Sequence, residues 1–316
     1  MFDRIRVACA WVAEHARHVR IAPDLETYAH SLDLAAVQAP RYDTEHHYLG
    51  EPDARAAYVV VLDAVNFGSG FFPALRTVDG RGGYHAVAWS LKRWFEEEGV
   101  PDTRVLRSLD AEAMATLLGQ DLDDPLRAEA MRLYAEALVE LGAFLDARMG
   151  GSAVTLVKSA GGSAERLAAL LAEMPFYRDV WRYDEREVPL YKRAQITASD
   201  LALAFDGSGY GAFDDLDRLT VFADDLLPHV LRTDGVLEYD APLARRIAAD
   251  EPLLAGSPEE VEVRAVTVHA AEQITAALRE DGVTVAPRDL DIALWNRGQD
   301  PRYGAVPRHR TITTAY

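Results

Sequence analysis

The chain has 316 residues, and its 51 acidic against 33 basic side chains give a formal net charge of −18. Its 49% hydrophobic and 9% aromatic residues are typical of a folded globular protein and argue against a disordered chain. The acidic balance argues against a protein that follows a nucleic-acid backbone, which needs a basic surface. Cys9 is the single cysteine, which excludes a disulfide framework and a thiolate metal site.

Membrane insertion and secretion are not expected either. No stretch of about 18 uncharged apolar residues is present, so the sequence predicts no transmembrane helix. The N-terminal residues mix charges with apolar positions and lack a small-residue cleavage site, which argues against a signal peptide. We therefore expect a cytoplasmic protein without a membrane partner.

The predicted elements in the first half of the chain are mostly helices. Tyr58–Leu62 is apolar throughout and fits a strand or a buried helix equally well, because periodicity cannot separate the two. Residues 126–148 place apolar side chains three and four residues apart, which predicts an amphipathic helix that begins after Asp124 and ends at Gly150. A shorter helix is predicted after Ser163.

The longest helix predicted in the second half of the chain begins with a capping box at Ser257. Proline follows at the first helical position, and Glu260 is placed to reach back to the backbone N–H of the cap residue. This helix should run to about Arg279, and Thr311–Thr314 fits a short edge strand. Together the elements predict a mainly α fold, a single globular domain over residues 1–316 with at most a few short strands.

Asn66–Phe72 is the first segment that points to a binding site. Glycine and serine interrupt a run of aromatic residues here, which leaves ring faces and backbone groups available to a ligand. An ordinary turn whose aromatic residues pack into the core explains the same pattern.

Asp224 is the carboxylate with the most unusual sequence context. If residues 219–231 were helical, its neighbours three and four positions away would be mostly apolar, and Pro228 would break the helix at this point. Burial raises the pKa of such a carboxyl group, and perturbed carboxyl groups concentrate in active sites. The alternative is a carboxylate that only caps the helix containing Pro228.

Lysine is rare in this chain: three of the 33 basic residues are lysines, and the others are arginines. Lys192 stands in a strongly amphipathic stretch ahead of Asp224, and its alternative role is that of a surface lysine. The histidines show no metal-ligand spacing, so neither a metal nor a cofactor is predicted.

Taken together, these segments resemble the queuosine salvage proteins, hydrolases that release queuine, a 7-deazaguanine, from queuosine 5′-monophosphate. The resemblance runs from about residue 40 to the C-terminus. It is carried by the order and spacing of several short blocks: Leu62-Asp63-Ala64-Val65-Asn66-Phe67, Gly83-Tyr84, Phe176-Tyr177-Arg178-Asp179-Val180, Tyr191-Lys192-Arg193-Ala194-Gln195-Ile196, Phe222-Ala223-Asp224, Glu260-Val261-Glu262-Val263-Arg264, Pro307-Arg308-His309-Arg310 and Tyr316.

This resemblance implies a helical fold related to the helix-hairpin-helix DNA glycosylases, with Asp224 as the catalytic carboxylate and Lys192 in the same site. Asp224 would stabilise an oxocarbenium-like transition state or activate water. Lys192 would hold a sugar hydroxyl or that carboxylate. The candidate substrate contacts are His47, Arg193 and Arg310 at the phosphate, Phe67 and Phe222 stacked on the base, Asn66 at the edge of the base, and Tyr84.

The expected partner is a small free nucleotide, whose base serves tRNA modification, and not a nucleic acid polymer. Two alternatives stay open: a helix-hairpin-helix DNA base glycosylase, and a non-catalytic nucleoside-binding module that uses Asp224 only as a helix cap.

Overall fold

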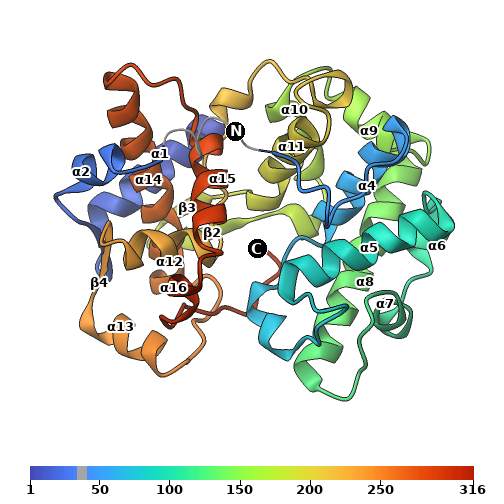
Figure 1. The fold of residues 1–316 in the computed structure, drawn as a ribbon, viewed down its shortest axis with the longest axis horizontal. Helices are drawn as coiled ribbons and strands as arrows, with labels where there is room; N and C mark the ends of the chain where they lie inside the picture. Colours follow the sequence, from blue (N-terminus) through green and yellow to red (C-terminus); the bar gives the residue numbers. More distant parts are fainter. Residues whose placement is uncertain (34–40) are drawn as a thin grey trace.

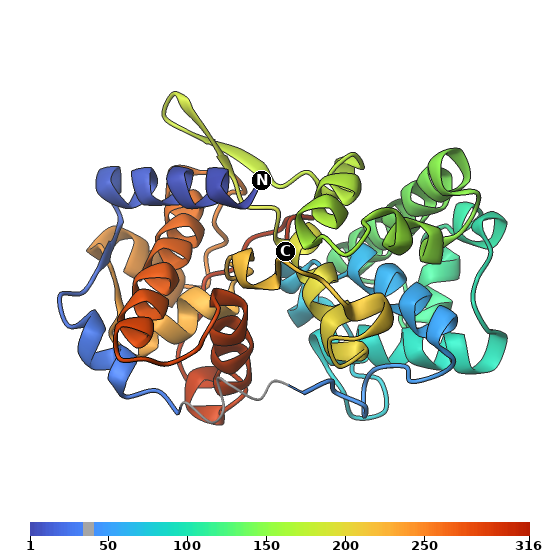
Figure 2. The ribbon, with the colours of Figure 1, turned by 90° about the horizontal axis from the view of Figure 1, so that it is seen from above.

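Helices dominate the structure, a computed structural model that describes residues 1–33 and 41–316 (Figure 1). The two ends of the chain build one half of the molecule, and the middle builds the other (Figure 2). The first half contains α1 Phe2–His15, β1 Val19–Ile21, α2 Leu25–His30, α12 Leu226–Thr233, β4 Leu237–Tyr239, α13 Ala241–Ala248, α14 Pro258–Glu280, α15 Pro287–Arg297 and α16 Pro301–Gly304.

The elements of the second half are helices among the described residues, apart from an isolated bridge between Val78 and Arg81. This half contains α4 Pro52–Ala64, α5 Gly83–Glu98, α6 Thr103–Arg107, α7 Ala111–Leu117, α8 Pro125–Met149, α9 Ala153–Ser159, α10 Ala164–Leu171 and α11 Lys192–Ala204, with the short 3₁₀ helix η1 Ser69–Ala74. Further 3₁₀ turns lie at η2 Pro175–Tyr177, η3 Gly209–Gly211 and η4 Leu216–Arg218. Here α8 packs against α4, α6 and α7, and α11 packs against α4 and α10.

The described strands form two separate antiparallel ribbons. In one ribbon β1 pairs with β4, with Val19 opposite Tyr239. In the other, β2 Val180–Tyr183 pairs with β3 Arg186–Pro189, and this hairpin packs on α1 and α14. The mainly α prediction with a few short strands is confirmed. No helix in the described part of the chain has the length and apolarity to cross a bilayer.

The predicted helix over residues 126–148 is confirmed as α8. The Asp124 carboxylate accepts hydrogen bonds from the N–H groups of Leu126 and Arg127, and Gly150 ends the helix at a φ of 59°. The helix after Ser163 is confirmed as α10.

At the start of α14 the Ser257 hydroxyl accepts the N–H of Glu260, as the capping box requires. The Glu260 carboxylate, however, accepts the N–H of Gly256 and not that of Ser257, so this reciprocal contact lies one residue from its predicted place.

Two ambiguous segments are resolved by their surroundings. Tyr58–Leu62 belongs to helix α4 and is buried on every side, which explains why it carries no periodicity. The predicted edge strand at Thr311–Thr314 is wrong, since only Thr311 pairs, in a single bridge with Leu253. Backbone groups further along this segment bond to the other half of the molecule, where the Tyr316 carbonyl accepts the N–H of Gly68.

Glycine at two positions permits this approach of the C-terminal segment. Gly68 has a φ of 93°, which side chains rarely adopt, and a Cβ atom on Gly70 would collide with the carbonyl group of Thr311. The Asn66–Phe72 segment is therefore both a tight turn and the place where the two halves of the molecule meet.

Candidate active site

A cavity of about 340 Å³ lies between the two halves. Its walls come from the residues after α4, the start of α5, one face of α11, the segment before α12, and α15. Seven of the nine predicted site residues line it: His47, Asn66, Phe67, Tyr84, Lys192, Phe222 and Asp224. Arg193 and Arg310 do not.

Asp224 reaches this cavity from an irregular segment. Residues 219–225 are not helical, and α12 begins at Leu226 with Pro228 in its first turn, as the proline rule predicts. Oδ1 of Asp224 accepts the N–H groups of Leu226 at 2.8 Å and Leu227 at 3.1 Å. Within residues 1–33 and 41–316 no group donates a hydrogen bond to Oδ2. The carboxylate therefore caps a helix with one oxygen and leaves the other for the cavity.

Burial shapes the electrostatics of Asp224. Burial and the adjacent Asp225 raise the pKa of the Asp224 carboxyl, whereas Lys192 and the two capping N–H groups lower it. The Asp225 carboxylate forms an ion pair with Arg308, and the Nε atom of Arg308 lies 2.8 Å from Oδ2 of Asp225. The pair brings a guanidinium group to the same end of the cavity as Asp224.

Lys192 is the first residue of α11 and is almost fully buried, which contradicts its interpretation as a surface lysine. Its ammonium group donates to the backbone carbonyl and to the side-chain Oδ1 of Asn66, both at 3.3 Å. Tyr191, just before it, has a φ of 50°, so the chain turns sharply into the helix. Lys192 thereby connects the Asn66 turn after α4 to the start of α11.

A buried ion pair fixes both Lys192 and Asp224 from behind. Arg264 on α14 donates to the two carboxylate oxygens of Asp179 at 2.9 and 2.7 Å. The same guanidinium donates through Nε to the carbonyl of Ala223, and Asp179 accepts the backbone N–H of Lys192. Burial alone would raise the pKa of Asp179, but Arg264 and the hydrogen bonds outweigh it and hold the pKa below its usual value.

One face of α11 runs along the cavity. The lining residues Lys192, Ile196, Ser199, Asp200 and Leu203 follow each other at helical spacing. Burial raises the pKa of Asp200 to about 6, against the lowering charges of Lys192 and Arg288. The cavity therefore carries several carboxyl groups around one ammonium group.

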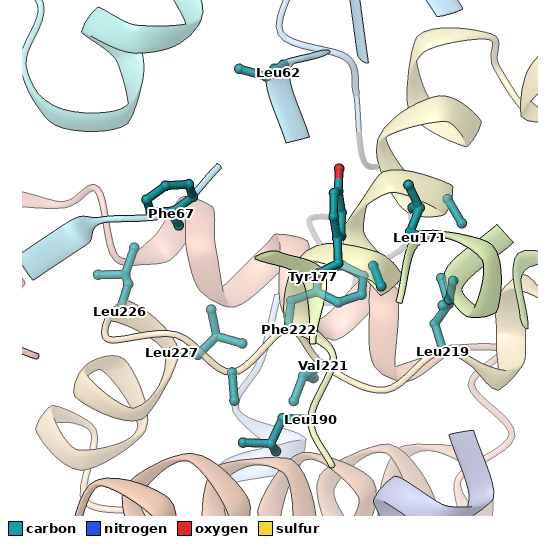
Figure 3. Packing of buried hydrophobic residues seen from close by; sticks show 14 of the residues in the cluster. Leu62, Phe67, Leu171, Tyr177, Leu190, Leu219, Val221, Phe222, Leu226 and Leu227 are labelled. Carbon is teal, nitrogen blue, oxygen red and sulfur yellow. The ribbon is translucent and has the colours of Figure 1, made fainter. Parts of the chain in front are cut away.

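Aromatic and aliphatic side chains form a further part of the cavity wall. Phe67 and Phe222 line the cavity and belong to the same buried cluster as Tyr177, Leu226 and Leu227 (Figure 3). The Phe67 ring also packs against Tyr134, with ring centroids 5.0 Å apart. Aromatic walls of this kind suit a planar heterocycle.

Comparison with known proteins gives the family. The model of the queuosine salvage protein family matches residues 46–316. This chain belongs to that family. Similar relatives are named queuosine 5′-phosphate N-glycosylase/hydrolase: the one from Sphaerobacter thermophilus is 39% identical over 313 residues and covers 96% of this chain and 95% of its own. The relatives from Dictyostelium discoideum and Mus musculus are each 30% identical to this chain. The matches cover 99% and 98% of this chain, respectively, and 98% of each relative.

Several of the sequence blocks that carried the resemblance contribute residues to the cavity or to the wall behind it. Asn66, Lys192 and Asp224 face it, and Asp179 and Arg264 hold the last two in place. Residue-by-residue reasoning missed the Asp179–Arg264 pair, although both residues stand in blocks that carried the resemblance.

The two predicted phosphate contacts that lie elsewhere have clear structural partners. Arg193 is buried, donates to the carbonyl of Ala64 at 2.7 Å, and stacks over the rings of Phe67 and Tyr177. It supports the aromatic wall from the side away from the cavity. Arg310 faces Asp250 at 3.4 Å. Neither guanidinium reaches the cavity.

His47 reaches the cavity without a positive charge. Its Nε2 lies 2.8 Å from the Tyr84 hydroxyl, and burial lowers the pKa of its ring to about 4. Near neutral pH it is therefore a neutral hydrogen-bonding group and not a cation for the phosphate.

Asp43, His46 and His85 form the one potential metal-ligand group among the described residues, with ligand atoms within 4.8 Å of one another. His46 Nδ1 lies 2.6 Å from Asp43 Oδ2. Two ligands of one zinc ion stand about 3 Å apart or more. The short contact is a direct hydrogen bond, so the cluster is explained without a metal.

Proposed function

We propose that this protein hydrolyses the N-glycosidic bond of queuosine 5′-phosphate and releases queuine, and that Asp224 is the catalytic carboxylate. The observation that carries the proposal is the free oxygen of Asp224, which lies in a cavity with aromatic walls and beside a buried lysine. Membership of the queuosine salvage family and the names of the similar relatives support the same reaction.

The chemistry of the bond explains why a carboxylate is needed. Cleavage of an N-glycoside leaves positive charge on the anomeric carbon and ring oxygen of the ribose. A carboxylate whose first oxygen is fixed by two N–H groups presents its second oxygen in a defined direction, which stabilises that charge or accepts a proton from the attacking water. The charge of Lys192 lowers the pKa of Asp224 against the effect of burial, which favours the ionised carboxylate, and the same ammonium group donates to the Asn66 turn.

Arg308 is our candidate for the 5′-phosphate. Its Nε is held by Asp225, and no group in the described chain accepts from its terminal nitrogens, which leaves a fork of donors for an anion. The phosphate is attached to the ribose, and Asp225 directly follows Asp224. A guanidinium at this end of the cavity is therefore placed for the phosphate when the ribose lies at Asp224.

The base then lies between Phe67 and Phe222, with Asn66, His47 and Tyr84 as neutral hydrogen-bonding partners. We propose a free nucleotide as the substrate and no nucleic acid polymer as a partner, since a net charge of −18 repels a long phosphate backbone.

Incubation of the protein with queuosine 5′-monophosphate tests this function, with free queuine measured by mass spectrometry. We expect complete release of the base, and no release from queuosine-containing tRNA under the same conditions. Binding without release would favour the non-catalytic module. Release from DNA carrying a damaged base, and not from the nucleotide, would favour the DNA glycosylase alternative.

A further inference from the structure

Asp291 is a cavity residue that the mechanism above does not use. It lies on α15, in the half of the molecule that also carries Asp224, and it is almost fully buried. Its Oδ1 accepts the backbone N–H of Phe222 at 2.6 Å. In the described part of the chain no group donates to its Oδ2, which is the oxygen left for the cavity.

The position of this hydrogen bond fixes where the carboxyl group stands. Phe222 belongs to the wall on which the base rests, and Asp224 follows two residues later. One carboxyl group is thus anchored on the backbone of the base-stacking residue, and the other lies at the sugar end of the same short segment. Two carboxyl groups around one glycosidic bond are the usual equipment for glycoside hydrolysis.

The surroundings of the two carboxyl groups differ. Burial raises the pKa of Asp291 to about 8, and the charges of Asp224 and Asp200 add to this effect. The N–H of Phe222 and the ammonium group of Lys192 oppose it, and Arg288 on the same helix is a further nearby cation. Asp224 receives two backbone N–H groups instead of one. Neighbouring carboxyl groups in unequal environments commonly divide into an acid and a base.

We propose that Asp291 is the general acid that protonates the departing base, which makes it a second catalytic residue. The inference rests on the proposed hydrolysis and on the place of Asp224 at the ribose. It assigns to Asp291 Oδ2 the transfer of a proton to the base, because Oδ1 of the same carboxyl group is bonded to the backbone of Phe222.

The leaving group explains why such an acid is needed. Queuine is a 7-deazaguanine and lacks the N7 atom that a purine hydrolase can protonate. Without a proton its ring leaves as an anion, which is a poor leaving group. A neutral carboxylic acid beside the ring removes this cost at the moment when the bond breaks.

Bond cleavage and proton transfer balance between the two carboxyl groups. The C1′–N9 bond breaks and its electron pair passes into the ring of the base, while Asp291 Oδ2 gives its proton to a ring nitrogen. Water adds its oxygen to C1′ and gives a proton to Asp224. The proton on Asp224 then returns to Asp291 through solvent, so that one water molecule is consumed and both carboxyl groups are restored.

Asp291→Asn tests the proposal, because the amide oxygen still accepts the N–H of Phe222 but the side chain has no acidic proton. We expect kcat for queuosine 5′-monophosphate to fall about 10²- to 10³-fold. On 4-nitrophenyl 5-phospho-β-D-ribofuranoside, whose leaving group needs no proton, the variant should stay within about threefold of the wild-type rate. Asp289→Asn, the same change two residues away and outside the cavity lining, is the matched control and should match wild type on both substrates.

Two results overturn the inference. A loss of equal size on both substrates would mean that Asp291 only maintains the structure, and a natural-substrate kcat within threefold of wild type would mean that it has no catalytic role. The pH profile decides independently of the artificial substrate: kcat of wild type should fall above about pH 8, where Asp291 loses its proton, and Asp291→Asn should lack this alkaline limb. If both enzymes show the same limb, the acid is another group.

The failure of the proposed function has a different signature. In that case wild-type protein releases no queuine at any pH, whereas failure of this inference leaves wild-type turnover intact.

Discussion

Arg264→Met removes the guanidinium that organises the site from behind. The variant loses two hydrogen bonds to the Asp179 carboxylate and one to the carbonyl of Ala223, and methionine fills most of the space. Asp179 is then a buried carboxylate without its cation. Breaking a buried ion pair in this way costs about 3–5 kcal/mol of the free energy of unfolding. Two charged hydrogen bonds at about 1.5–3 kcal/mol each give a similar figure, about 3–6 kcal/mol.

The loss should depend on pH in a defined direction. In the wild-type protein the pKa of Asp179 lies below its ordinary value of 3.8, so its stabilising effect is full above that value and is lost as the pH falls through the lower, folded-state pKa. In the variant, burial raises the pKa of Asp179 instead. The difference in stability between the two proteins should therefore be greatest near pH 7 and shrink as the pH approaches 4.

Urea unfolding followed by circular dichroism at pH 7 and pH 4.5 measures this difference. Arg132→Met is the matched control. Within the described residues Arg132 forms ion pairs with Glu129 and Glu136 on the exposed face of α8, so its replacement should cost at most about 1 kcal/mol. If Arg264→Met costs no more than this control at pH 7, or if its cost grows toward pH 4.5, the buried pair does not have the role described above.

The remaining predictions concern the cavity itself. Lys192→Met removes the ammonium group that donates to Asn66, and we expect kcat to fall about 10²-fold with an unchanged far-UV circular dichroism spectrum; full activity would contradict its place in the site. Arg308→Met should raise the KM for queuosine 5′-monophosphate about tenfold to a hundredfold and leave kcat/KM for the nucleoside queuosine within about threefold of wild type. A nucleotide and a nucleoside affected to the same degree would place the phosphate elsewhere.

Local signals in the sequence predicted the helices well. The aspartate, proline and glycine around α8 and the serine cap of α14 act on the backbone of the adjacent residues, so the boundaries follow from the sequence itself. Tyr58–Leu62 carries no such signal, because a segment buried on all sides has the same apolar composition as a strand or as a helix. Only the packing of α4 between α5, α8, α9 and α11 decides between the two.

The site was predictable where sequence context restricts a single side chain. Asp224 stands beside a proline that breaks the helix, and Lys192 is one of three lysines, so the sequence alone distinguishes both residues from their neighbours. The direction of adjacent side chains was not predictable. Arg193 follows Lys192 directly, but the turn of the helix directs it to the carbonyl of Ala64 behind the wall.

The same reason explains why the sequence pointed to Arg310 as a substrate contact, whereas Arg308 is the arginine of the C-terminal segment that lines the cavity. Residues 308 and 310 lie in an irregular stretch, where neither helical nor strand periodicity tells which side chain faces the cavity. The structure brings Arg308 to Asp225 and turns Arg310 to Asp250. Asp200 and Asp291 were missed because nothing near them in the sequence marks a carboxyl group that faces a cavity. They lie on two helices far apart in the chain, α11 and α15, which both line the cavity.

Asp224→Asn is the most direct test of the central claim. The amide keeps an oxygen for the N–H groups of Leu226 and Leu227, so the helix cap and the fold should be retained. We expect the variant to bind queuosine 5′-monophosphate within about tenfold of the wild-type Kd and to release free queuine at least about 10³-fold more slowly. Release at a near wild-type rate by a folded, substrate-binding Asp224→Asn protein would contradict the role of this carboxylate.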